Sequence, residues 1–90
     1  MASGPWSAAI DSSPPTYSFG SDKKTVQLMS FAILLVQTSE AAANHAKAAI
    51  RAGATLEELH ASAGIAALFR GVAAFNLAGE ILSTLFPDGK

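Results

Sequence analysis

The sequence predicts an all-α protein: a compact bundle of about four helices in residues 22–90, preceded by an irregular arm in residues 1–21. Two observations lead to this prediction. Alanine and long apolar side chains recur at helical spacing near residues 22–36, 39–52, 56–70 and 72–86, with glycine or turn residues between these segments. No run of β-branched or aromatic residues alternates with period two, so no strand is expected.

The arm is predicted from its proline, glycine, serine and threonine residues, which favour loops over helices. Its aromatic side chains, Trp6, Tyr17 and Phe19, could pin it to the helical body. The alternative is a mobile tail.

The segment 22–36 is predicted to be a core helix, capped by Ser21 or Asp22. Its apolar run, LMSFAILLV, is much shorter than the ~20 residues that a membrane-spanning helix needs. Because the helix is apolar on nearly every face, we expect it to be buried on several sides, most simply at an interface between subunits.

The segment 39–52 is predicted to be an alanine helix with one polar stripe. The stripe consists of side chains three or four positions apart: Glu40, Asn44, Lys47 and Arg51. The other faces are nearly all alanine, which lets neighbouring helices approach closely, and His45 stands among these alanines.

A sharp turn is predicted after this helix. Gly53 is expected to provide a left-handed C-cap. Thr55 and Glu58 have the spacing of a capping box, in which the Thr55 hydroxyl accepts from the Glu58 N–H and the Glu58 carboxylate accepts from the Thr55 N–H. We assign Glu58 to capping alone.

The last two segments are predicted to be helices with one apolar face each. The helix at 56–70 is expected to bury Leu59, Ala63, Ala66, Ala67 and Phe69. The helix at 72–86 is expected to bury Leu77, Ala78, Ile81, Leu82 and Leu85, and to keep Asn76, Glu80 and Ser83 in water.

The composition excludes several classes of protein. Without cysteine, and without a four-ligand cluster of His, Asp and Glu, we expect no disulfide, no metal and no other cofactor. A net charge of −1, with no basic stripe, argues against nucleic acid as a partner. No membrane-spanning segment or secretory signal is visible, so the expected location is cytoplasmic. Oligomerisation is then the remaining way to bury an apolar content of 50%.

Two motifs point to a known family. Residues from His45 to Glu58 follow H-x-x-A-A-x-x-A-G-A-T-x-E-E, and those from Phe69 to Asn76 follow F-x-G-V-x-A-x-N. With its D-K-K-T start to the first helix, the chain resembles the carboxymuconolactone decarboxylase family, which shares its all-helical fold with the AhpD-type alkyl hydroperoxidases. The resemblance covers residues 22–85. It implies an AhpD-like fold and a homo-oligomer, either a trimer or a hexamer built from trimers.

The departures from the family pattern bear on activity. In the hydroperoxidase branch a C-x-x-C pair precedes the histidine, whereas this chain has Thr38 and Ala41 at those positions. A dithiol peroxidase needs a thiolate nucleophile and a resolving thiol, so that activity is excluded. The family's upstream glutamate is matched by Gln27, so a carboxylate that could relay protons is also absent.

The decarboxylase branch also lacks the cysteines, and its Glu-rich segment before the histidine resembles Ser39-Glu40. The resemblance implies acid/base chemistry, in which His45 protonates carbon as carbon dioxide leaves a small carboxylated lactone and a cation holds the carboxylate. Arg70 and Glu40 are the predicted substrate-binding residues, while Gly53, Thr55 and Glu58 are structural.

For each candidate a structural alternative stays open. His45 could be a core histidine bonded to a backbone carbonyl or to a side chain of another helix. Arg70 could cap the carbonyls at its helix end, and Glu40 could belong to a solvated face. The alternative function is a non-catalytic oligomeric protein, structural or ligand-binding, that kept the fold and lost the site.

Overall fold

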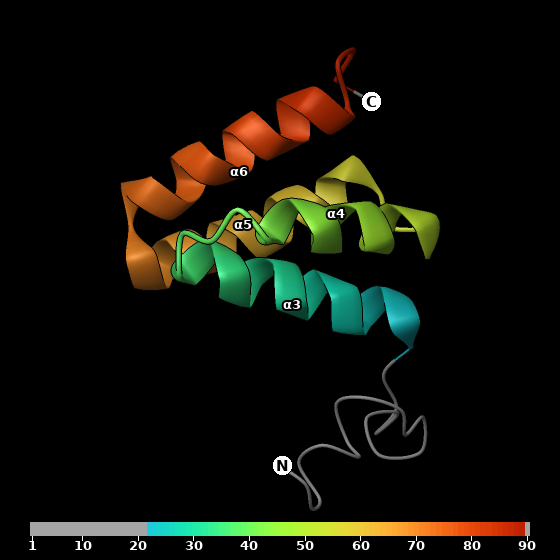
Figure 1. Ribbon diagram of the computed structural model, residues 1–90, viewed down its shortest axis with the longest axis horizontal. Coiled ribbons are helices and arrows are strands. Elements are labelled where there is room, and N and C mark those ends of the chain that lie inside the picture. Colours follow the sequence, from blue (N-terminus) through green and yellow to red (C-terminus); the bar gives the residue numbers. More distant parts are fainter. Residues whose placement is uncertain (1–21, 90) are drawn as a thin grey trace, which may run out of the picture.

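The computed structural model describes residues 22–89, so the predicted arm lies outside the described residues. Four helices follow one another: α3 (Lys23–Val36), α4 (Ala42–Arg51), α5 (Leu56–Arg70) and α6 (Val72–Leu85). Successive helices run in opposite directions, with α3 packed against both α4 and α5, and α6 crossing above them (Figure 1). Residues 22–89 contain no strand. The predicted all-α fold of four helices is confirmed.

Helix α3 begins at the predicted cap. Oδ1 of Asp22 accepts the Thr25 N–H at 2.9 Å, and this bond lowers the pKa of the Asp22 carboxyl below its ordinary value. Phe31 and Leu35 are fully buried on the inner side of the helix. Met29 and Ile33 are each 56% exposed, so this chain by itself does not bury α3 on every side.

The turn between α3 and α4 shortens the second predicted helix. The N–H groups of Thr38 and Ser39 donate to the carbonyls of Leu35 and Leu34, which ends α3 in a Schellman motif with Thr38 at φ +51°. The Ala42 N–H then donates to the Ser39 carbonyl, three residues back, as in a tight 3₁₀ turn. Helix α4 therefore starts at Ala42 and not at residue 39.

Helix α4 has the predicted amphipathic pattern. The side chains of the polar stripe, Glu40, Asn44, Lys47 and Arg51, are exposed, while Ala42, Ala46 and Ala49 are fully buried. After α4, Gly53 takes a φ of +103°, and its N–H donates to the Ile50 carbonyl. This conformation favours glycine, so the predicted left-handed C-cap is confirmed.

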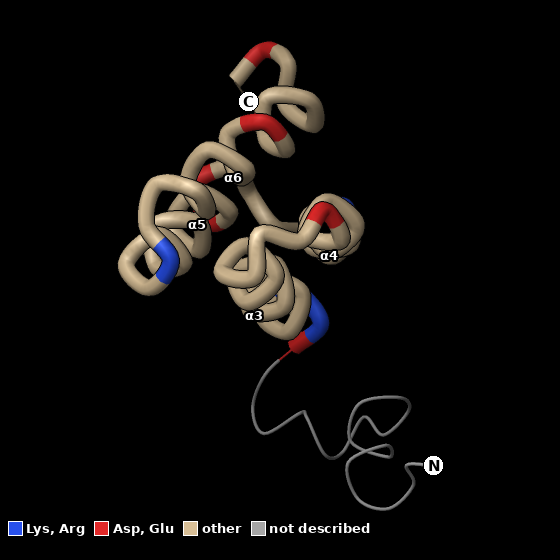
Figure 2. The backbone as a smooth tube through the Cα atoms, turned by 60° about the vertical axis from the view of Figure 1, so that its left-hand side comes forward, with Lys and Arg blue, Asp and Glu red and all other residues tan. Residues whose placement is uncertain are grey.

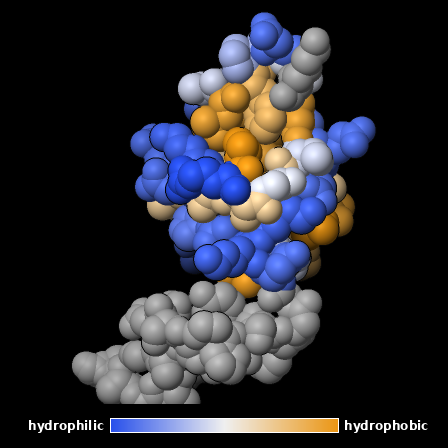
Figure 3. Space-filling model, turned by 90° about the vertical axis from the view of Figure 1, so that its right-hand side faces the viewer, coloured by the Kyte–Doolittle hydropathy of each residue, from blue (hydrophilic) through white to orange (hydrophobic). Residues whose placement is uncertain are grey.

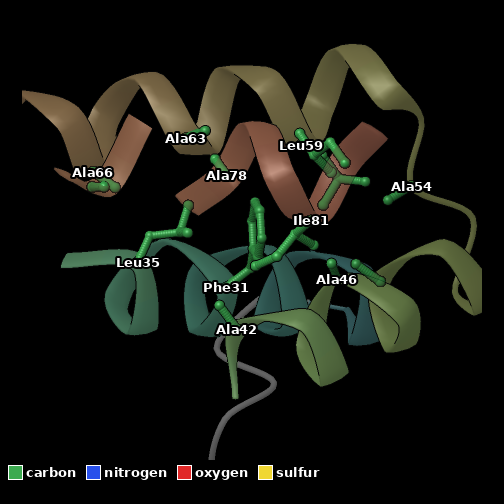
Figure 4. Packing of buried hydrophobic residues seen from close by; sticks show 13 residues of the cluster. Phe31, Leu35, Ala42, Ala46, Ala54, Leu59, Ala63, Ala66, Ala78 and Ile81 are labelled. Atoms are coloured by element: carbon green, nitrogen blue, oxygen red, sulfur yellow. The ribbon is translucent and has the colours of Figure 1, made fainter. Parts of the chain in front are cut away.

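The core lies between the four helices and consists mostly of small side chains. Its large, fully buried members are Phe31, Leu35 and Leu59, and Figure 4 shows Phe31 pointing from α3 toward α5 and α6. Buried alanines from α4, α5 and α6 complete the core, which lets the backbones approach closely.

The two faces of α6 are confirmed by its burial pattern. The prediction for α5 is confirmed for Leu59, Ala63 and Ala66, but it is wrong for Phe69, which is 79% exposed. Phe69 lies in the last turn of α5, at the edge of a groove that it lines with residues of α3.

Candidate functional site

His45 contacts a side chain of the neighbouring helix. Its Nδ1 lies 2.7 Å from Oε1 of Gln27, so the contact joins α4 to α3. The imidazole is half-buried. The interpretation of His45 as a core histidine predicts such a partner on another helix. The same contact also determines what the imidazole can do chemically.

The Gln27 contact fixes the tautomer of His45. An amide oxygen can only accept a hydrogen bond, so the 2.7 Å contact places a proton on Nδ1. In the neutral imidazole, Nε2 then keeps its lone pair and is the atom that can take up or release a proton. Gln27 also stands where the family pattern has its glutamate, and the contact shows that this position does reach the histidine.

A second polar contact lies one turn away on α3. Nζ of Lys24 donates to Oε2 of Glu58 at 3.0 Å, joining α3 to the start of α5. The side chains of both residues are about one-third exposed, at 32% and 38%. The sequence interpretation of Glu58 as a capping residue alone is therefore incomplete, because its carboxylate also forms an ion pair.

The capping box itself is confirmed. Oε1 of Glu58 accepts the Thr55 N–H at 2.9 Å, and the Thr55 hydroxyl oxygen accepts the Glu58 N–H at 3.1 Å. The bond from the Thr55 N–H, followed by the Lys24 ammonium, lowers the pKa of the Glu58 carboxyl. Each of the two Glu58 carboxylate oxygens thus has a donor.

We use the name polar cluster for two contacts that start one turn apart on α3, Lys24 with Glu58 and Gln27 with His45. Lys24 and Gln27 are three residues apart, which makes them neighbours on one side of α3. Lys24 reaches α5 and Gln27 reaches α4, so the cluster spans three helices (Figure 2 shows charged positions of both signs at the start of α3). Lys24 could be noticed in the sequence only through the D-K-K-T match at the start of this helix.

Glu40 stands two residues before α4 and lies apart from His45. It lines a cleft of about 280 Å³ between α4 and α6, together with Ala43, Lys47, Leu77, Glu80, Ile81, Thr84 and Leu85. Ala43 and His45 are two positions apart, so their side chains project about 200° from each other around the helix axis. Figure 3 shows hydrophobic side chains between hydrophilic ones on the side of the molecule where α4 and α6 separate. The structure does not bring Glu40 into the polar cluster.

Arg70 is also separated from His45. It ends α5, twelve residues after Glu58, which corresponds to about 18 Å along the helix axis. Its side chain is exposed. Since Glu58 marks the end of α5 that meets the polar cluster, Arg70 stands at the opposite end.

Within residues 22–89, no group of three or more His, Cys, Asp or Glu side chains is arranged to hold a metal ion. In the same part of the chain, no helix combines the length and the apolar character needed to cross a membrane. Thr38 and Ala41, which stand at the positions of the family's cysteines, are both exposed.

Comparisons with known proteins give one finding. A sequence model of the carboxymuconolactone decarboxylase family matches residues 18–83. No curated protein and no solved structure matches the chain.

Proposed function

Because the chain belongs to the carboxymuconolactone decarboxylase family, we propose that it is a cysteine-free acid/base lyase that acts on a small carboxylated lactone, with His45 as the proton donor. The observation that carries this proposal is the 2.7 Å contact between His45 Nδ1 and Gln27 Oε1. It orients the one half-buried imidazole among residues 22–89 and leaves its Nε2 for proton exchange.

The proposed step is a decarboxylation. The bond between the carboxylate and the lactone ring breaks, carbon dioxide leaves, and the electron pair remains on the ring carbon, delocalised into the unsaturated lactone. A proton from Nε2 of the His45 imidazolium then forms the new C–H bond, and solvent returns a proton to Nε2. Gln27 keeps its hydrogen bond to Nδ1 throughout, because that nitrogen carries a proton in both states of the ring.

The chemistry of the chain is incompatible with the peroxidase branch of this fold. The sequence contains no cysteine, and the two positions of the dithiol pair carry Thr38 and Ala41. Neither side chain can form a thiolate or a disulfide. The proposal is therefore restricted to proton transfer.

One observation favours a second candidate, a non-catalytic structural or ligand-binding protein. Gln27 presents a neutral amide where the family pattern has a carboxylate, and an amide cannot carry a proton away from the imidazole. A protein that kept the fold and the histidine contact but no longer turned over substrate would show the same geometry.

We also propose that the chain forms a homo-oligomer, a trimer or a hexamer built from trimers. Large apolar side chains of α3, α5 and α6 are more than half exposed: Met29, Ile33, Ile65, Leu68, Phe69, Val72 and Phe75. Three of them, Ile33, Ile65 and Phe69, line one groove of about 310 Å³ between α3 and α5. So much exposed apolar surface on a small chain is typical of a contact between proteins.

The experiment that tests the proposed activity is a screen of the purified protein against unsaturated lactone acids, with released carbon dioxide as the readout. The lyase proposal expects turnover of at least one member of the panel. Binding of a lactone acid with no release of carbon dioxide, at a saturating concentration, would instead favour the non-catalytic candidate. Absence of both from a panel that varies ring size and carboxylate position would contradict the lyase proposal and leave a structural protein as the candidate.

A further inference from the structure

The Lys24 ammonium group has N–H donors that its described contacts do not use. An ammonium carries three N–H donors, and the described contacts of Lys24 use one of them, for Oε2 of Glu58. The side chain is 32% exposed, so a ligand from solvent can reach it. Lys24 is therefore a cation that is held in place at the polar cluster and still accessible.

Glu58 does not depend on Lys24 for its position. Oε1 of Glu58 accepts the Thr55 N–H, and this bond holds the carboxylate at the start of α5. The ion pair itself is partly exposed on both sides, and such pairs are easily exchanged because water and other ions compete for them. A second carboxylate can thus share or replace Oε2 as the partner of Lys24 without unfolding the helix start.

The position of Lys24 on α3 also suits a role near His45 better than the positions of the other two cations do. It is a helical neighbour of Gln27, and Gln27 contacts His45, so the ammonium and the imidazole belong to the same side of the bundle. Arg70, the cation that the sequence suggested, stands about 18 Å along α5 from Glu58. Lys23 is the next residue to Lys24, but its side chain is exposed and projects about 100° away around α3.

We propose that Lys24 is the substrate-binding residue that holds the carboxylate of the ligand beside His45, and that Glu58 occupies Lys24 until the ligand arrives. This inference rests on the proposed function for the class of ligand, a small carboxylated lactone. It adds the residue that recognises the carboxylate, and it adds a competition: Glu58 and the ligand carboxylate bind the same ammonium.

If Glu58 and the ligand compete for Lys24, substitutions of Lys24 and of Glu58 should change the affinity for a carboxylate in opposite directions. Lys24→Met keeps most of the side-chain stem and removes the charge, so it should weaken binding of a carboxylate. Glu58→Gln removes the competitor and keeps an N3 residue that suits a capping box, so it should strengthen binding. If the ion pair served only to hold α3 against α5, both substitutions would act in the same direction, because both break it.

The test uses coumalate, an unsaturated lactone with one carboxylate, and methyl coumalate, its uncharged ester, as probes. Dissociation constants are measured by NMR titration of the full chain and of the variants Lys24→Met, Lys24→Arg, Glu58→Gln and Lys23→Met. Helical content by circular dichroism confirms that each variant is folded. Because binding is the readout, the test does not require that coumalate is turned over, and a lack of decarboxylation would count against the proposed function alone.

The parent chain should bind coumalate more tightly than methyl coumalate. Lys24→Met should reduce this preference by about fivefold, Lys24→Arg should restore most of it, and Glu58→Gln should increase it. Lys23→Met, the matched control, should leave it unchanged. Equal binding of the two probes by the parent, or a loss of coumalate binding in Lys24→Met that is matched by Glu58→Gln or by Lys23→Met, would overturn the proposal.

Discussion

Nδ1 of His45 and Oε1 of Gln27 lie 2.7 Å apart and join α4 to α3 at the polar cluster. A carboxylate at position 27 could hold the imidazole and also accept its proton. An amide can only hold it. Proton exchange at His45 must therefore pass through Nε2, and this chain differs from a carboxylate–histidine pair in having one route for the proton and not two.

The capping box offers a test of the turn before α5. Thr55→Ala removes the oxygen that accepts the Glu58 N–H at 3.1 Å, and one donor at the helix start loses its partner. We expect the free energy of unfolding to fall by about 1 kcal/mol. Urea unfolding measures this change. A midpoint equal to that of the parent would show that the cap contributes nothing to stability.

Thr38 offers a test in which the substitution should raise the free energy of unfolding. It is the one non-glycine residue with a positive φ among residues 22–89, and a β-branched side chain is strained in that conformation. Thr38→Gly should relieve the strain and stabilise the chain by up to about 1 kcal/mol. Thermal unfolding beside Gln37→Gly, the adjacent C-cap residue with a φ of −83°, provides the comparison. If both glycine variants lost stability equally, the assignment of strain would be wrong.

The acid limb of the stability curve should depend on Glu58. Its pKa is lowered in the folded chain, first by the Thr55 N–H and then by Lys24, so its contribution is present above the unfolded pKa and is lost as the pH falls through the folded pKa. Asp22 acts in the same direction. We expect the free energy of unfolding to be nearly flat above about pH 6 and to decline below about pH 5.

Glu58→Gln isolates this contribution, because the variant keeps an amide oxygen for the Thr55 N–H but does not titrate. Its stability should decline less steeply in acid than that of the parent. Urea midpoints measured at several pH values provide the comparison. Parallel curves for parent and variant would contradict the assignment.

The sequence predicted the helices well where local signals set their ends. The range 56–70 agrees with α5 because the capping box begins it and Gly71 ends it. The predicted range 39–52 begins before the observed helix does. The N–H groups of Thr38 and Ser39 bond to the end of α3, so α4 begins only at Ala42. No residue in that stretch indicates a Schellman motif. The left-handed position of that motif is usually glycine, whereas here it is threonine.

The site was harder to predict, because its contacts join distant parts of the sequence. The family resemblance pointed to His45 and Gln27, but their contact spans 18 positions, and that of Lys24 with Glu58 spans 34. Nothing in local periodicity fixes which side chains meet across such separations. Glu40 was predicted from its resemblance to the Glu-rich segment of the decarboxylase branch, and Arg70 from its positive charge at a helix end. The packing of the helices places both away from the polar cluster.

The proposed homo-oligomer is tested best at Phe69. This side chain is 79% exposed, so an aspartate there costs the isolated chain little, but it would bury a charge if a second copy covers it. We expect Phe69→Asp to shift the sedimenting species toward a 9.2 kDa monomer at micromolar concentration. Leu68→Ser, at the neighbouring residue with 83% exposure, removes an apolar side chain without adding charge and should have a weaker effect. A parent chain that sediments as a folded monomer would contradict the proposal.

The proposed decarboxylation requires His45 to transfer the proton. The decisive measurement is the rate of carbon dioxide release from a lactone acid that the parent decarboxylates, compared between His45→Ala and His60→Ala. His60 is the other histidine of the chain; it is exposed on α5 and serves as the matched control. We expect His45→Ala to lose at least about 100-fold in kcat, the usual contribution of a general acid, and His60→Ala to match the parent. A His45→Ala variant that is folded and releases carbon dioxide at the parent rate would contradict the claim.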